Sequence, residues 1–274
     1  MDRIRRNERM AAMMKMLSSM PNRIFTLSSF CELFGTAKST MSEDVDLLDR
    51  TARAFDLGRV ETVTGAAGGV RYRPLISRKK ALECIGGLCG ELSGAERLLP
   101  GDFLYYSDIL STPDIVNRMG EIIATEFYAT EPDFVLTMET KGIPVAFATA
   151  NALGIPLVIA RHSSRVYEGS AVNINYVSGS GSIETMSLSR RAIRENQRAL
   201  IVDDFLKGGG TARGMVELMR EFSVSVTGMA FVMATARPEK KRVSGEKALM
   251  TLEIAPGDPA RAVVKPAAWL RETT

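Results

Sequence analysis

Apolar residues in the first 74 positions recur three and four residues apart in three segments, the spacing that places them on one face of a helix. The predicted helices cover residues 9–17, 26–35 and 37–56. Two extended runs then flank Gly68 and Gly69, which indicates a β-hairpin. The residues expected in the core of this part are Met10, Met13, Met14, Leu17, Leu27, Phe30, Cys31, Phe34, Met41, Val45, Leu48, Ala52 and Phe55.

The pattern changes after Pro74. A helix is predicted over residues 76–94, and from about residue 115 continuous apolar runs alternate with helical segments. Such alternation is typical of a parallel sheet covered by helices on both faces. We therefore predict a multi-domain α/β protein with a domain boundary between residues 1–74 and 75–274. The predicted strands are residues 133–138, 156–160, 199–204 and 226–235.

One segment of the second domain departs from this alternation. Val172, Ile174 and Tyr176 alternate with polar residues, a run of Ser and Gly turns the chain at 178–182, and Ile183 resumes an extended run. The pattern predicts a hairpin arm. The sequence leaves open whether this arm is a structural element or a functional lid. The aromatic stretch at 99–110 also has no assigned role.

Composition narrows the class of protein and locates its charge. The 274 residues are 45% hydrophobic and 24% charged, which is ordinary for a globular protein. No run approaches the roughly 18 apolar residues of a membrane span, and four arginines in the first ten residues argue against a secretory signal. The formal net charge of +3 arises in residues 1–74, which hold twelve Lys and Arg against nine Asp and Glu. This excess predicts a polyanionic partner for the first domain.

Cysteine and histidine usage argues against a metal site. Cys31, Cys84 and Cys89 lie in apolar, helix-like contexts, and His162 is the only histidine. No familiar zinc spacing joins them, so the cysteines are predicted to be reduced thiols of a cytoplasmic protein.

The strongest candidate site lies in the segment ALIVDDFLKGGGTARGM, residues 199–215. Asp203 and Asp204 end a predicted strand, where two carboxylates can accept hydrogen bonds from vicinal sugar hydroxyls. The amides of residues 208–211 can surround a phosphate, and the next helix directs its positive end to the same place. A Walker loop is excluded because the Gly-Lys-Ser/Thr order is missing. These features predict a site for a phosphorylated sugar.

A second loop follows the predicted strand at 133–138. Its residues 139–144 include Lys141, which brings a positive charge, and Gly142, which allows close approach of the backbone. Together these residues can bind a pyrophosphate.

Three short helices and a hairpin are typical of a winged helix-turn-helix. The first turn of the third helix would face the major groove of DNA, with short polar donors and one cation. Arginines at the amino end and on the hairpin would contact backbone phosphates. The alternative is a helical dimerisation cap with solvated charges. The predicted DNA contacts are Arg3, Arg5, Arg6, Arg9, Lys38, Ser39, Thr40, Ser42, Arg71 and Arg73.

The segment ALIVDDFLKGGGT resembles the sugar-phosphate motif of the type I phosphoribosyltransferases. The whole chain resembles the purine operon repressor family of Gram-positive bacteria. That likeness rests on an ordered series of segments: TAKSTMSEDV, TGAAGGVRY, LPGDFLYYSDIL, TKGIP, EGSAVNINYVSGS, TMSLS and DDFLKGGGT. It implies a homodimeric transcription factor whose phosphoribosyltransferase-like domain binds phosphoribosyl pyrophosphate (PRPP) without transfer. Bound PRPP would weaken operator binding.

The resemblance also implies residue roles. The acidic pair would bind the ribose hydroxyls, the loop from Lys207 to Thr211 the 5′-phosphate, and the first loop the pyrophosphate, with help from Arg161. Apart from the resemblance, Phe205 and Phe103 are candidates for stacking on the base of a phosphorylated guanosine nucleotide. Mg²⁺ is the expected companion of PRPP. The implied effector site comprises Thr140, Lys141, Gly142, Arg161, Asp203, Asp204, Phe205, Lys207, Gly208, Gly209, Gly210 and Thr211.

Lys207 departs from the transferase pattern, which usually has a small residue or threonine there. The extra cation can bind a further phosphate, so a guanosine polyphosphate is a second ligand candidate for the pocket. Two other functions stay open: an active purine phosphoribosyltransferase with a DNA-binding arm, and a DNA-binding module whose second domain only dimerises. The second of these leaves the phosphate loop unexplained.

Overall fold

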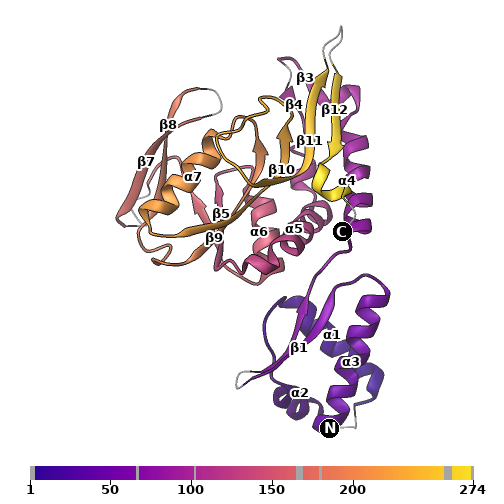
Figure 1. Cartoon of the computed structure of the whole chain (residues 1–274). Helices are drawn as coiled ribbons and strands as arrows, with labels where there is room; N and C mark the ends of the chain where they lie inside the picture. The colour runs from indigo at the N-terminus through magenta and orange to yellow at the C-terminus, as the bar shows by residue number, and fades with distance from the viewer. Residues whose placement is uncertain are drawn as a thin grey trace. The chain divides into compact units, whose positions relative to one another are not determined.

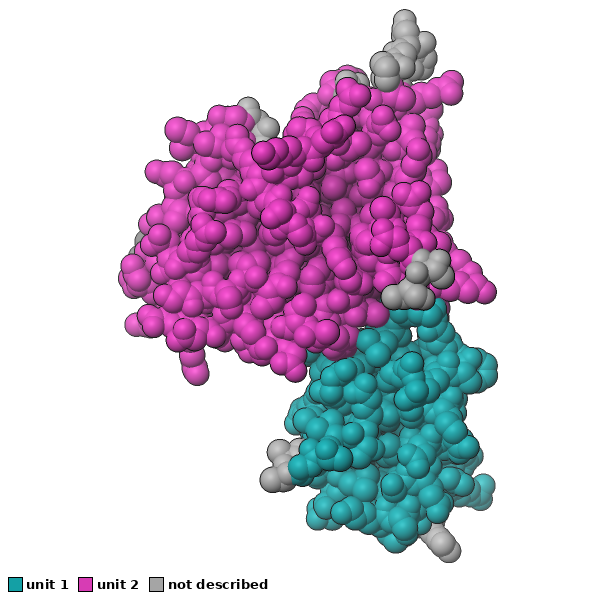
Figure 2. Space-filling model, in the orientation of Figure 1, with its two compact units in different colours: residues 1–77, 151–154 teal, residues 78–150, 155–274 magenta. Residues whose placement is uncertain are grey.

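The computed structural model describes residues 4–65, 68–101, 103–164, 169–178, 181–255 and 261–272 (Figure 1). The chain divides into two compact units, drawn in different colours in Figure 2. One unit consists of residues 1–77 and 151–154, and the other of residues 78–150 and 155–274.

The amino-terminal unit contains three helices followed by an antiparallel hairpin, as the sequence pattern predicts. The side chain of Thr26 caps the second helix by accepting a hydrogen bond from the Ser29 amide. Gly35 ends that helix in the left-handed conformation, with φ of 60°. The elements are α1 (Arg6–Ser19), α2 (Leu27–Phe34), α3 (Lys38–Ala54), β1 (Arg59–Val63) and β2 (Gly69–Arg73).

The core of this unit joins all five elements. Met13, Phe30 and Met41 come from different helices and are at most 1% exposed, and Val70 of β2 closes the cluster. One expected core position is wrong. Phe55 is 70% exposed because α3 ends at Ala54, so the chain turns away before the stripe of apolar residues is completed.

The second unit is built on a six-stranded sheet in the order β12-β11-β10-β9-β5-β6. All neighbouring strands are parallel except β12, which is antiparallel at one edge. The predicted fold class, an α/β sheet domain with a winged helix-turn-helix domain before it, is therefore confirmed. The strands are β5 (Phe134–Met138), β6 (Leu157–Ala160), β9 (Arg198–Leu206), β10 (Ser225–Thr235), β11 (Glu246–Ala255) and β12 (Arg261–Pro266).

Sequence analysis missed β11 and β12. The β11 segment, EKALMTLEIA, is rich in Glu, Lys, Leu, Met and Ala, which favour helices. It is a strand because its neighbours β10 and β12 supply backbone partners on both sides. Tertiary pairing thus overrides local preference here.

Helices and short elements complete the unit. α7 contacts β5, β9 and β10, whereas α5 contacts β10 and α4 contacts β12. The bounds are α4 (Arg78–Leu92), η1 (Ala95–Arg97), β3 (Leu98–Leu99), β4 (Phe103–Leu104), η2 (Ile109–Ser111), α5 (Pro113–Phe127), η3 (Tyr128–Thr130), α6 (Ile143–Leu153), α7 (Gly210–Glu221) and α8 (Ala268–Arg271).

The predicted arm is a separate two-stranded antiparallel hairpin of β7 (Ala171–Val177) and β8 (Ile183–Ser189). Its strands pack against α7 (Figure 1). In addition, β8 contacts β6. Buried Val172, Tyr176, Met186 and Leu188 place one face of the arm in the main apolar core of the unit.

Candidate functional site

The two predicted ligand loops meet at one edge of the sheet. β5 and β9 are parallel neighbours, so the loops that follow them leave from the same edge. From β5 the chain continues to β6 on one side, and from β9 it continues to β10 on the other, which makes this point the topological switch of the sheet. Gly142 confirms how close the loops are: a Cβ atom there would overlap Oδ1 of Asp203.

The two aspartates of β9 have different environments. Asp203 is 7% exposed, and its Oδ1 accepts a hydrogen bond of 3.0 Å from the Asp204 amide. Burial, and then the charge of Asp204, raise the pKa of Asp203 well above its ordinary value. Asp204 is half-buried, and its Oδ2 accepts a hydrogen bond of 2.6 Å from the Tyr106 hydroxyl. The pair therefore consists of one buried carboxyl and one half-buried carboxyl.

Tyr106 is a site residue that sequence analysis missed. Its ring stacks on Phe205 at a centroid distance of 6.0 Å, and Nζ of Lys141 lies 5.3 Å from its centroid. Burial, and then the charge of Asp204, raise the pKa of its hydroxyl, so Tyr106 stays a neutral hydrogen-bond donor. Its place in the aromatic stretch at 99–110 was the available signal. Phe103, the expected stacking residue from that stretch, is 69% exposed.

The glycine loop after β9 has a backbone shape that leaves room for close approach of a ligand. Gly209 has φ of 80°, a left-handed conformation that favours glycine, and α7 begins at Gly210. The amino end of this 12-residue helix faces the loop. Lys207 is exposed, whereas Gly208 and Thr211 are partly exposed.

A basic segment that sequence analysis missed lies beside this loop. It follows β10 and includes Lys241, whose Nζ donates to the Thr235 carbonyl at 2.7 Å. The Arg242 amide donates to the Gly208 carbonyl at 3.0 Å. The signal was a run of cations after a strand whose carboxyl end lies at the same sheet edge. The basic residues of the segment are Arg237, Lys240, Lys241 and Arg242.

The loop after β5 is exposed at Thr140 and Lys141 and buried at Gly142. Glu139 precedes it. The Oε2 atom of Glu139 lies 3.2 Å from Nη1 of Arg161, and its Oε1 accepts from the His162 amide at 2.7 Å. Burial raises the pKa of Glu139, but the His162 amide and the Arg161 guanidinium outweigh it and leave the pKa lowered. Arg161 is thus held beside this loop by an ion pair.

The predicted DNA-contacting residues of the amino-terminal unit differ in accessibility, and two of the arginines pair with a buried carboxylate. The guanidinium of Arg9 is buried and lies 2.6 Å from the Asp44 carboxylate, which is also fully buried. Arg6 contacts the other oxygen of Asp44 at 2.8 Å. Arg9 is therefore a structural residue that joins α1 to α3, and its expected contact with DNA phosphates is wrong.

The other predicted contacts are more accessible. Lys38, Ser39 and Ser42 are exposed on the first turn of α3, and Thr40 is partly exposed. Arg5 is exposed, whereas Arg3 lies outside the described residues. The wing arginines Arg71 and Arg73 are partly exposed and both pair with Glu61 at 3.2 Å. That carboxylate reduces the positive charge available on the wing.

The fold and the site define a phosphoribosyltransferase-like domain joined to a winged-helix unit. Residues 106–267 match the phosphoribosyl transferase domain family, and residues 5–74 match the bacterial purine repressor amino-terminal family. The chain belongs to the bacterial purine repressor family, whose members are transcriptional regulators of purine biosynthesis.

Relatives that match the chain over most of their length support this assignment. The chain is 42% identical, over 90% of its length and 91% of the relative's, to a probable purine biosynthesis transcriptional regulator of Streptococcus pneumoniae. It is 39% identical to the purine biosynthesis transcriptional repressor of Bacillus subtilis, over 91% and 88% of the two chains. It is 38% identical to the purine biosynthesis transcriptional activator of Lactococcus lactis, over 91% and 93%.

Solved structures share the fold of the second unit. Adenine phosphoribosyltransferase from Thermoanaerobacter pseudethanolicus is 20% identical, with a TM-score of 0.52, and the match covers 60% of this chain and 99% of that one. The enzyme from Rhodothermus marinus is 21% identical, also with a TM-score of 0.52, over 63% and 97%. Within the described residues, no helix has the length and apolarity needed to cross a membrane.

Proposed function

We propose that the protein binds operator DNA of purine biosynthesis genes through its amino-terminal unit and PRPP at the β5–β9 edge of its second unit. PRPP binding releases the DNA and leads to no transfer reaction. The observation that carries the proposal is the meeting of an acidic pair, a glycine loop and a cation-bearing loop at the switch point of one sheet. We propose further that the protein is a cytoplasmic homodimer, as the resemblance implies.

In this proposal each part of PRPP has its own partners. Asp203 and Asp204 bind the ribose hydroxyls, and Phe205 and Tyr106 form the wall beside them. Mg²⁺ accompanies the pyrophosphate. A guanosine polyphosphate competes for the same pocket, with Lys207 binding its additional phosphate. The 5′-phosphate partners are Lys207, Gly208, Gly209, Gly210 and Thr211, and the pyrophosphate partners are Thr140, Lys141, Gly142 and Arg161.

The test is a mobility-shift titration of DNA from upstream of purine biosynthesis genes, with and without PRPP and Mg²⁺. We expect PRPP to weaken DNA binding. In parallel, the protein is incubated with PRPP and adenine, guanine, hypoxanthine or xanthine, and no pyrophosphate should be released. Turnover at about one per second, ordinary for an enzyme, would instead establish the active transferase.

A second candidate concerns the direction of regulation. The Lactococcus lactis relative is named an activator, although it is nearly as similar to this chain as the Bacillus subtilis repressor. In an activator, PRPP would strengthen productive binding to DNA. The same titration separates the two candidates, because they predict opposite signs for the effect of PRPP.

A further inference from the structure

We propose that Arg242 is a positioning residue that ties the glycine loop to the hairpin arm, so that binding of a phosphate at the loop also orders the arm. The inference rests on the proposed function, because it assigns the loop to a phosphate group. No ligand is expected to contact the Arg242 side chain directly.

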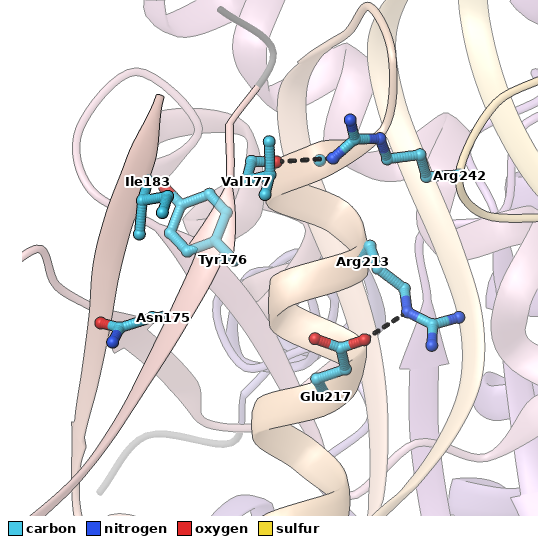
Figure 3. Close-up of a pocket in the computed structure, with 8 residues that line it drawn as sticks. Asn175, Tyr176, Val177, Ile183, Arg213, Glu217 and Arg242 are labelled. Carbon is cyan, nitrogen blue, oxygen red and sulfur yellow. Dashed lines mark hydrogen bonds and ion pairs between the residues drawn. The ribbon is translucent and has the colours of Figure 1, made fainter. Parts of the chain in front are cut away.

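Arg242 bridges the loop and the arm with two bonds. Its backbone amide donates to the Gly208 carbonyl at 3.0 Å, and its guanidinium donates to the Val177 carbonyl at 3.1 Å (Figure 3). Val177 is the last residue of β7. One residue therefore contacts the first glycine of the loop and the end of an arm strand.

The arm end also packs directly on the start of α7. A Cβ atom at Gly210 would overlap the Val177 carbonyl oxygen, so the absence of a side chain there lets the arm approach. A Cβ atom at Gly214, one turn further, would lie 2.9 Å from the Tyr176 ring. The arm and the amino end of α7 are thus in close contact at two successive helical turns.

Tyr176 adds a polar link between the same two elements. Its hydroxyl donates to Oε2 of Glu184 across the arm at 2.9 Å, and it also forms a hydrogen bond with the side chain of Thr211. Burial, and then the bond to Glu184, raise the pKa of Tyr176 to about 12, so the hydroxyl remains protonated at neutral pH. Thr211 is itself a predicted phosphate contact.

The loop needs such restraint because of its composition. Three successive glycines have many accessible conformations, and ordering them at each binding event costs free energy. Gly208 has open space where its side chain would be, so packing does not restrain it. The Arg242 amide donates to the Gly208 carbonyl, and the Arg242 side chain is bonded to the arm. This bridge reduces the cost of ordering the loop and couples the arm to ligand binding at the loop.

Arg213 provides a matched control. Arg213 and Arg242 line the same cavity of about 320 Å³ between the arm and α7 (Figure 3). Nε of Arg213 instead pairs with Glu217 on the same helix at 2.5 Å. Its removal changes the charge of the cavity by the same amount without breaking the bridge to Val177.

The experiment compares Arg242→Ala, Arg242→Lys and Arg213→Ala in the full chain by calorimetric titration with PRPP, ribose 5-phosphate and pyrophosphate. We expect Arg242→Ala to weaken binding of PRPP and of ribose 5-phosphate about fivefold each, the scale of one lost hydrogen bond of ordinary net strength, and to leave pyrophosphate binding unchanged. Arg242→Lys should recover part of the loss, and Arg213→Ala should match the wild type.

Hydrogen exchange of β7 amides gives the second measurement. Saturating ribose 5-phosphate should slow exchange in the wild type and leave it unchanged in Arg242→Ala. Equal behaviour of Arg242→Ala and Arg213→Ala, or equal loss of all three ligands, would overturn the inference while leaving the proposed site intact. A wild type that binds neither PRPP nor ribose 5-phosphate would overturn the proposed function and this inference together.

Discussion

At the scale of single residues, Asp203 shows a conflict between stability and binding. The carboxyl is buried beside Asp204, and both factors raise its pKa above the ordinary value of 3.8. A carboxyl whose pKa is raised by folding binds its proton more tightly in the folded state. Its ionisation therefore reduces the stability of the fold as pH rises from 3.8 through the raised pKa. The ligand-free protein therefore keeps, at the position where a sugar hydroxyl donor is expected, a carboxyl whose ionisation the fold disfavours.

Replacing Asp203→Asn should therefore stabilise the ligand-free protein at pH 7. The amide oxygen can still accept the bond from the Asp204 amide, and the group whose ionisation the fold disfavours is removed. We expect the melting temperature to rise by a few degrees at pH 7, and the gain to vanish as pH approaches 4. Calorimetric melts across this range test the prediction, with Asp204→Asn as the more exposed control. A lower melting temperature at pH 7 would contradict it.

At the scale of elements, the first turn of α3 presents exposed polar and basic side chains that are available to DNA. Arg9 and Arg6 are engaged with Asp44, and Arg71 and Arg73 with Glu61. Lys38 is exposed at the amino end of α3, next to Ser39 and Ser42. The charge of this helix end is therefore expected to determine much of the salt dependence of DNA binding.

Lys38→Ala should weaken operator binding and flatten its dependence on salt. The slope of log K against log salt is negative, and one lost phosphate contact reduces its magnitude by about 0.9. Fluorescence anisotropy titrations at several salt concentrations measure this slope. Lys15→Ala is the control: it removes an exposed charge near the carboxyl end of α1 and should leave the slope unchanged. An unchanged slope in Lys38→Ala would favour the dimerisation-cap alternative for this unit.

At the scale of the whole molecule, the proposed function joins two binding equilibria. If PRPP lowers affinity for operator DNA by some factor, DNA must lower affinity for PRPP by the same factor. Asp204→Ala removes a half-buried carboxylate that is the proposed acceptor for the ribose hydroxyls, and a bond to a charged acceptor contributes roughly 1.5–3 kcal/mol. We expect PRPP binding to weaken about tenfold or more.

DNA binding without PRPP should be unchanged in Asp204→Ala, and release should require about tenfold more PRPP than in the wild type. Mobility shifts at increasing PRPP, together with PRPP titrations of the free and DNA-bound protein, test both the reciprocity and the residue. Glu217→Ala, on the same unit but outside the acidic pair, is the control. If Asp204→Ala releases DNA at the same PRPP concentrations as the wild type, the effector binds elsewhere.

The sequence alone predicted the parts of this protein that local pattern determines. The spacing of Met13, Leu17 and Met41 indicated helices, and the apolar runs before Asp203 and Glu139 indicated strands, because backbone periodicity decides which side chains share a face. Parallel strands place their following loops at one edge, so the acidic pair and the Lys141 loop were predicted as parts of one site. Both meet in the structure at Gly142.

Tertiary structure decided what depends on contacts between distant segments. Tyr106 lies 98 positions before Asp204, and Arg242 lies 65 positions after Val177, so no local pattern indicates either bond. Arg9 and Arg6 look alike in sequence, yet the packing of α1 on α3 buries the guanidinium of Arg9 against Asp44 and leaves Arg6 half-exposed. β11 has a helix-favouring composition and became a strand through its neighbours. The physical reason is common to all four cases: burial and pairing free energies between segments exceed the small local preferences that a sequence pattern records.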